Sequence, residues 1–152
     1  MLIKAYLDNS LINQKYKLVI SGLIEKNNYC RDLIKLSSKN LNIIFTGYVS
    51  GQTKQELLSN CHLFILPSTL EGNSLSLNEA LGLKKLCLVS DIPIHQQYQK
   101  EFPIIITFKT DSLSDFQNKL EKSVNTINKA KSNINSDWGK TAQTYIDIFE
   151  KI

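Results

Sequence analysis

The sequence predicts an α/β domain built on a three-layer, doubly wound parallel sheet. Its 152 residues are enough for one domain with a buried core, and 42% of them are hydrophobic. Short apolar runs alternate with segments whose apolar residues recur at helical spacing. Strands that are apolar throughout are typical of a parallel sheet that helices cover on both faces. We therefore expect residues 1–152 to form a single domain of this class.

The candidate strands are five apolar runs: Lys17–Gly22, Asn42–Gly47, His62–Leu66, Lys85–Ser90 and Pro103–Phe108. Their inward-facing side chains should form the core of the domain. The core residues that we expect are Val19, Ile44, Phe64, Ile65, Leu88 and Ile105.

Helices are expected in the intervening segments. They should span Met1–Leu11, Glu25–Lys39, a segment from Thr53 to Cys61, Ser74–Leu83, and two amphipathic stretches near the C-terminus. Thr53-x-x-Glu56 has the pattern of a capping box, and Tyr29, Leu33 and Leu36 should face inward. A connection over Lys129–Asp137 should separate the last two helices. Their apolar stripes are Leu113, Phe116, Leu120, Val124 and Ile127, then Trp138, Ala142, Tyr145, Phe149 and Ile152.

Composition excludes several classes of function. The net charge is only +4, Arg31 is the single arginine and the lysines are spread out, so a nucleic-acid footprint is not supported. Cys30, Cys61 and Cys87 have no paired spacing, which favours free thiols over disulfides or a metal site. No apolar run approaches the roughly 20 residues that span a bilayer, and no signal peptide opens the chain. We expect a cytoplasmic location, with any membrane attachment made through a partner.

The stretch from Pro67 to Leu81 carries the most chemical information. The third apolar run stops at Pro67, which cannot continue a central strand, and small turn-prone residues follow it. A helical apolar pattern then begins at Leu75, so Glu71 should lie in a loop and Glu79 in the first turns of a helix. A helix N-terminus favours a phosphate or a sugar-bearing anion, and carboxylates accept hydrogen bonds from hydroxyl groups.

This stretch resembles the donor-sugar motif of retaining glycosyltransferases of the GT-B, group 1 type. In that family a strand ends in Pro-Ser, Glu-Gly-x-x-Leu follows, and a second Glu stands eight positions after the first. Pro67-Ser68, Glu71-Gly72-Asn73-Ser74-Leu75 and Glu79-Ala80 match this pattern, although the family often has Gly where Ser74 stands.

The resemblance implies roles for these residues. Glu71 would be the catalytic residue and would hold hydroxyls of the donor sugar, while Glu79 would take the ribose hydroxyls. The backbone amides that would face the sugar and phosphates are those of Gly72, Asn73, Ser74 and Leu75. Structural alternatives stay open, because Ser76-x-x-Glu79 is also a capping-box pattern and Glu71-Gly72 an ordinary turn pair.

Further candidates follow the first two strands. By the resemblance, the loop Gly47-Tyr48-Val49 would border the nucleobase. Lys26 and Arg31 follow the strand that ends at Gly22 and would partly replace the cations that bind the donor diphosphate in the family, with Lys26 nearer the strand end. The alternatives are a plain turn that needs Gly47 and a solvated helix charge for Lys26 and for Arg31. His95, after Asp91-Ile92-Pro93, is expected in a surface loop. No His, Cys and Asp cluster has metal-ligand spacing.

The resemblance covers almost the whole chain but only part of an enzyme. In the family, the donor-binding half opens with a strand whose Gly-Arg and following Lys bind the donor diphosphate, and this sequence begins at the next helix. In the dinucleotide-binding fold the strands lie in the order 3-2-1-4-5-6, so the missing first strand is central. If the neighbours of that strand pair directly, the five remaining strands, numbered along this chain, lie in the order 2-1-3-4-5. Ligands bind such sheets at the carboxyl ends beside the switch point between the first and third strands, which again selects Gly22 and Pro67–Glu79.

We therefore expect the C-terminal, donor-binding half of a GT-B glycosyltransferase that lacks its first strand. It would use a UDP- or GDP-linked sugar, without a metal or cofactor, for retaining hexosyl transfer to a sugar or lipid acceptor in polysaccharide biosynthesis. The isolated chain should be inactive, and its partner would be an N-terminal half on another chain or a second copy. The alternatives are a non-catalytic nucleotide-sugar-binding or regulatory module and a flavodoxin-like domain with another ligand.

Overall fold

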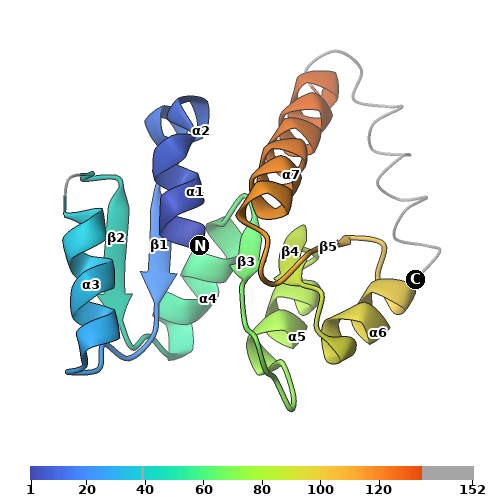
Figure 1. Cartoon of the computed structure of the whole chain (residues 1–152). Helices are drawn as coiled ribbons and strands as arrows, with labels where there is room; N and C mark the ends of the chain where they lie inside the picture. Colours follow the sequence, from blue (N-terminus) through green and yellow to red (C-terminus); the bar gives the residue numbers. More distant parts are fainter. Residues whose placement is uncertain (39, 135–152) are drawn as a thin grey trace. The chain divides into compact units, whose positions relative to one another are not determined.

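The computed structural model describes residues 1–38 and 40–134 of the chain (Figure 1). These residues group into two compact units, Met1–Leu57 and the segment that begins at Leu58, and each unit is described by itself. Helix α4, Gly51–Asn60, runs across the boundary. The expectation of a single domain over 1–152 stays a prediction.

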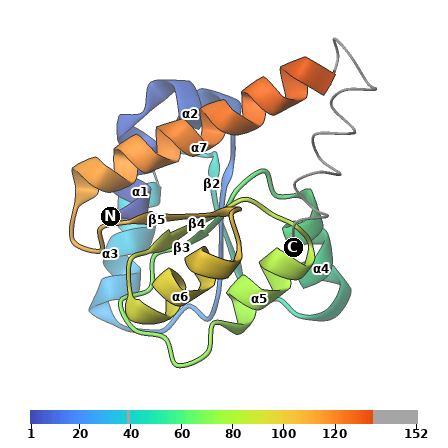
Figure 2. The same ribbon diagram turned by 90° about the vertical axis from the view of Figure 1, so that its right-hand side faces the viewer.

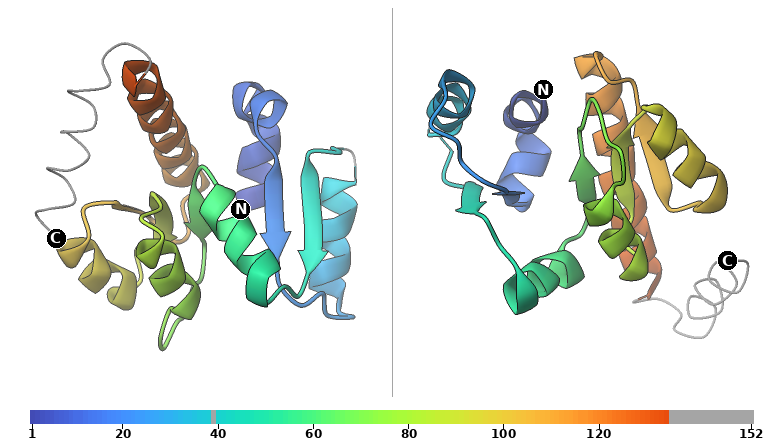
Figure 3. Two further views of the ribbon diagram at one scale, coloured as in Figure 1. Left: turned by 180° about the vertical axis from the view of Figure 1, so that it is seen from behind. Right: turned by 90° about the horizontal axis from the view of Figure 1, so that it is seen from below.

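The first unit is a two-stranded parallel sheet with helices on one face. Its elements are α1 (Leu2–Asp8), α2 (Ser10–Lys15), β1 (Leu18–Ser21), α3 (Asn28–Ser37) and β2 (Ile43–Gly47). Leu18 pairs with Ile43 and Val19 with Ile44. Helices α1 and α3 lie on the same face of these strands (Figures 1 and 3). Side chains alternate along a strand, so this arrangement buries Leu18 and Ile43.

The same alternation corrects part of the expected core. Val19 is 41% exposed and Ile44 is 38% exposed, because they lie on the face that the unit's own helices do not cover. Of the other expected core residues, Leu88 and Ile105 are buried, and Phe64 and Ile65 are half-buried.

The expected N-terminal helix is two helices that meet at Asn9. The backbone of Asn9 is extended, and its side-chain oxygen accepts a hydrogen bond from the Ile12 amide at 3.0 Å, which starts α2. The Tyr6 hydroxyl donates to the Tyr16 carbonyl at 2.6 Å and holds α1 against the end of α2. Ile3, Ala5 and Tyr6 of α1 are buried.

Two further expectations about helices are wrong. Tyr29 is 70% exposed and Leu36 is 41% exposed, whereas Ser37 of the same helix is buried. The Asn27 side chain caps the Cys30 amide at 2.8 Å and starts α3 at Asn28. Leu33 is half-buried, so the inward stripe of α3 includes Leu33 and Ser37 and leaves out Tyr29 and Leu36. Similarly, α4 begins at Gly51, so Thr53 lies inside the helix and cannot be its N-cap.

The second unit is a three-layer α/β arrangement. Its elements are β3 (Phe64–Leu66), α5 (Leu75–Gly82), β4 (Cys87–Ser90), α6 (Pro93–Glu101), β5 (Ile105–Phe108) and α7 (Leu113–Ile134). The parallel strands run in the order β3-β4-β5, and every residue of the central strand β4 is buried. Helices α5 and α6 lie on one face of this sheet and α7 on the other (Figures 2 and 3).

Side chains alternate between the two faces of this sheet, so the core of the unit has two parts. Cys87, Val89 and Ile105 pack with Leu77, Ala80 and Leu81 of α5. On the opposite face the ring of Phe108 meets the ring of Phe116 of α7 edge-on, with centroids 4.7 Å apart.

The structure extends or corrects the expected elements near the C-terminus. Helix α6 covers the segment that was expected to be a loop around His95, and α7 continues through part of the expected connection Lys129–Asp137. The expected final helix, from Trp138 to Ile152, lies outside the described residues.

The expected sheet order is confirmed for the pairs β1–β2, β3–β4 and β4–β5, all of which are parallel. The two sheets are separate in their hydrogen bonding, so the five-strand order 2-1-3-4-5 is unconfirmed. Within the described part of the chain, no helix is both long and apolar enough to cross a membrane.

Candidate functional site

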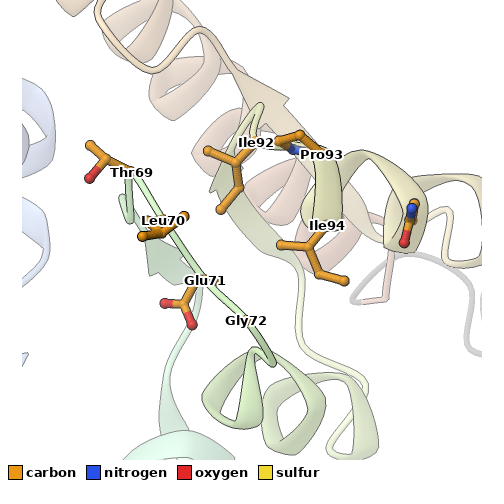
Figure 4. Close-up of a pocket in the computed structure, with 8 residues that line it drawn as sticks. Thr69, Leu70, Glu71, Gly72, Ile92, Pro93 and Ile94 are labelled. Carbon is orange, nitrogen blue, oxygen red and sulfur yellow. The ribbon is translucent and has the colours of Figure 1, made fainter.

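A pocket of about 310 Å³ opens at the carboxyl ends of β3 and β4. The loop between β3 and α5 supplies one wall, and the start of α6 supplies the other (Figure 4). The lining residues are Thr69, Leu70, Glu71, Gly72, Ile92, Pro93, Ile94 and Gln97. Parallel strands place both loops at the same edge of the sheet, which is where ligands bind in α/β folds.

Glu71 is the acidic residue of this pocket. Its carboxylate oxygen Oε1 accepts a hydrogen bond from the Ser68 hydroxyl at 2.6 Å, and the side chain is half-buried. A carboxylate has about four acceptor positions, so this bond leaves Glu71 able to accept from hydroxyl groups of a ligand.

The residues that follow Glu71 lead into the start of α5. Gly72 is exposed, and a Cβ at this position would meet no atom within 4 Å. Asn73 accepts a hydrogen bond from the Asn78 amide group at 3.3 Å. The backbone amide of Leu75 donates to the Asn73 carbonyl at 2.9 Å, so in this structure the Leu75 amide already has an acceptor.

Ser74 differs from its neighbours because it is fully buried. It is the N-cap of α5, but its side chain makes no capping bond to its own helix. The alternative capping box, with Ser76 as N-cap and Glu79 at its third position, is therefore wrong, since Ser76 lies inside the helix. Glu79 is exposed on α5 and is not among the residues that line the pocket.

The candidates of the first unit follow the carboxyl ends of β1 and β2. The Gly22 amide donates to the Gly47 carbonyl at 3.0 Å, and φ is +153° at Gly22 and +70° at Gly47. Tyr48 is 71% exposed. Val49 is half-buried after β2, and Lys26 is exposed in the loop before α3.

The family of the chain is decided by comparison with known proteins. The family model for glycosyl transferases group 1 matches residues 1–142. The chain belongs to the glycosyl transferases group 1 family. Membership implies a nucleotide-sugar substrate. No curated protein matches the chain.

The expectation for His95 of this glycosyltransferase domain is wrong. His95 was expected on the surface, but it is fully buried on α6. Its ring nitrogen Nε2 lies 3.0 Å from the Ser74 hydroxyl, and Nδ1 lies 3.0 Å from the Ser90 carbonyl oxygen. The available signal was Pro93, which stands at the first position of α6, where proline is favoured.

Asp91 fixes the loop between β4 and α6 in this domain. Its Oδ1 accepts from the Thr110 hydroxyl at 2.6 Å and from the Thr110 amide at 2.9 Å. These bonds, led by the one from the hydroxyl, hold the pKa of Asp91 below its ordinary value. Asp91 therefore connects the loops that follow β4 and β5.

The cysteines of the domain are free thiols. Burial raises the pKa of the Cys87 thiol to about 12 and also raises the pKa of Cys61, so neither thiol ionises readily. Among the described residues, no cluster of His, Cys, Asp or Glu side chains could hold a metal ion.

Proposed function

We propose that this glycosyltransferase domain binds the sugar of a UDP- or GDP-linked donor at the pocket beside Glu71. The observation that carries the proposal is the Glu71 carboxylate, held by Ser68 at 2.6 Å on the wall of a pocket of about 310 Å³. That volume is near the lower end of ligand pockets, roughly 300–1,000 Å³, and suits a hexose better than a whole nucleotide-sugar.

The domain would take part in retaining transfer of a hexosyl group to a sugar or lipid acceptor. Glu71 would accept hydrogen bonds from the sugar hydroxyls, and the amides at the start of α5 would face the phosphates. For the rest of the donor we keep the roles expected from the sequence. The ribose would lie at Glu79, the diphosphate near Gly22 and Lys26, and the base beside Gly47, Tyr48 and Val49.

The charge of the pocket argues that the isolated chain binds the donor without turning it over. None of the residues that line the pocket is a lysine or an arginine, so Lys26 is the one cation that the proposed roles place near the diphosphate. A departing diphosphate needs cationic or N–H donors, and each missing one costs about 10²–10³ in rate. A partner, either an N-terminal half or a second copy, would supply these groups and the acceptor surface.

Calorimetric titration of the purified chain tests the proposal. UDP-glucose, GDP-mannose, UDP and GDP are the proposed ligand class, and FMN and NAD represent the flavodoxin-like alternative. We expect one nucleotide-sugar to bind and Glu71→Gln to weaken its binding. Glu101→Gln, an exposed substitution on α6, is the matched control and should leave binding unchanged. Binding of FMN or NAD alone would contradict the proposal.

Glu79→Ala separates a ligand contact from a structural role. Loss of a hydrogen bond to a charged group should weaken nucleotide binding by about 1–3 kcal/mol while the melting temperature stays close to wild type. Unchanged binding with a lower melting temperature would remove Glu79 from the site.

The same lack of cations favours a second candidate, a non-catalytic nucleotide-sugar-binding module. Product formation from labelled donor and generic acceptors discriminates the two. Transfer that appears only when a partner domain is added supports half of an enzyme. Donor binding that never leads to transfer with any partner supports the module.

A further inference from the structure

The side chains of His95, Ser74 and Ser90 form a buried cluster that does not belong to the lining of the pocket. All three side chains are fully buried in the second unit, and they come from α6, the start of α5 and the end of β4. Buried polar groups are costly unless each finds a partner, and here every one does.

The hydrogen bonds assign one role to each atom of this cluster. The Ser90 hydroxyl donates to the Ser68 carbonyl, so its remaining capacity is to accept. His95 Nδ1 lies 3.0 Å from the Ser90 carbonyl and 3.2 Å from the Ser90 hydroxyl oxygen, and it must therefore carry the hydrogen. In the neutral ring Nε2 is then the acceptor, and the Ser74 hydroxyl donates to it across 3.0 Å.

The bond between Ser74 and His95 fixes the C-terminal end of the loop between β3 and α5. Ser74 is the N-cap of α5, and a serine there commonly bonds an amide of its own helix. Its hydroxyl is instead directed to His95 of another helix. The position of the α5 N-terminus is therefore tied to α6 by this contact.

The contacts of Ser90 with His95 and with the Ser68 carbonyl fix the beginning of the same loop. Ser90, which contacts the His95 ring, holds the Ser68 backbone through its hydroxyl. The Ser68 side chain in turn holds the Glu71 carboxylate at 2.6 Å. The chain of contacts from the imidazole to Glu71 passes through two hydroxyl groups and one serine backbone.

We propose that His95 is a positioning residue that ties both ends of the Ser68–Ser74 loop to α6. The loop residues that line the pocket lie between these two ties, and the opposite wall is the start of α6 itself (Figure 4). His95 thereby sets the distance between the two walls and the place of the Glu71 carboxylate. The effect on donor binding rests on the proposed function, whereas the effect on the loop does not.

The alternative is that His95 only fills space in the core. His95→Phe tests this, because it keeps an aromatic ring and removes both hydrogen bonds. His95→Gln retains an acceptor near the position of Nε2 and keeps the tie to Ser74. His95→Asn retains a donor near the position of Nδ1 and keeps the tie to Ser90. These two variants also serve if His95→Phe does not fold.

Two measurements are made on each variant: amide hydrogen exchange by NMR and the affinity for UDP-glucose and GDP-mannose. In His95→Phe, amides of 68–75 should exchange about tenfold faster, the factor for one lost buried hydrogen bond, while amides of β4, β5 and α7 hold their rates. In His95→Gln the amides of residues 74 and 75 should keep their slow exchange. In His95→Asn the amides near Ser68 should keep theirs. Any nucleotide-sugar that binds should lose affinity by a similar factor.

Two controls exclude a general loss of stability. Phe116→Leu weakens the core on the α7 face, and Gln99→Ala removes the side-chain contacts of α6 with β5. Both should leave the loop-specific pattern of exchange as in wild type. If His95→Phe changes exchange only in the uniform manner of Phe116→Leu, the positioning role is wrong. If the wild-type chain binds neither sugar nucleotide, the proposed function fails while the exchange data still decide the role of His95.

Discussion

The Ser68 hydroxyl donates to the Glu71 carboxylate across 2.6 Å, within the loop that forms one wall of the pocket. Residues three apart in a loop can satisfy each other in this way without help from the rest of the fold. The bond orients the one carboxylate of the pocket before any ligand arrives, and preorganisation of this kind lowers the cost of binding.

Ser68→Ala should release Glu71 and weaken donor binding by about 1 kcal/mol, the net value of a typical hydrogen bond. The measurement is the dissociation constant of the nucleotide-sugar that the wild-type chain binds best. Ser123→Ala removes a hydroxyl that bonds the Lys119 carbonyl at 2.7 Å in α7 and is the control. Equal effects of the two substitutions would show that Ser68 has no special role at the site.

Asp91→Asn should destabilise the chain more at pH 7 than at low pH. The folded pKa of Asp91 lies below its ordinary value of 3.8, so its charge contributes stability above that value. The contribution is lost as the pH falls through the folded pKa. Urea unfolding of Asp91→Asn and wild type at pH 7, 4 and 2.5 checks this, with Asp111→Asn as the exposed control. A difference in unfolding free energy that grows toward low pH would contradict the assignment.

Gly47→Ala should destabilise the chain by about 1–2 kcal/mol, the cost of a left-handed backbone for a residue with a Cβ. The strain is conformational, because φ is +70° and a Cβ at Gly47 would meet nothing within 4 Å. Gly82→Ala is the matched control, since its Cβ also meets nothing within 4 Å and its φ is not positive. Gly82 ends α5, where alanine should be neutral or stabilising by up to about 1 kcal/mol. Equal melting temperatures for the two variants would refute the strain.

Cys87 should resist alkylation until the chain unfolds. It is fully buried, and burial raises its pKa to about 12. Iodoacetamide at pH 8, followed by peptide mass spectrometry, should label the half-buried Cys30 first and Cys87 only after urea is added. Labelling of Cys87 in the absence of urea, at the rate of Cys30, would show that the β4 core opens.

The sequence was informative where local chemistry decides structure. Apolar runs predicted the strands, and Pro67 correctly marks the end of β3 before the loop that carries Glu71. It was less informative about which side of an element faces inward. In α3, Leu33 and Ser37 face inward and Tyr29 is exposed, although the apolar spacing predicted a buried Tyr29.

Side-chain contacts between residues far apart in the chain could not be predicted from the sequence. Ser74 and His95 are 21 positions apart, and their contact exists only because β3 and β4 are parallel neighbours. A serine and a histidine carry no periodic signal, and the helix that holds His95 was itself missed. The loop and Glu71 were candidates from the sequence and line the pocket, while their role at a donor site stays a prediction. The buried cluster that supports the loop was not predictable.

NMR chemical-shift mapping with the nucleotide-sugar that binds tests the central proposal most directly. The account predicts the largest amide shifts at 69–74 and 92–97, the two walls of the pocket, with the Glu71→Gln variant losing these shifts. Saturable shifts confined to other parts of the chain, or shifts at the pocket that Glu71→Gln retains in full, would contradict it.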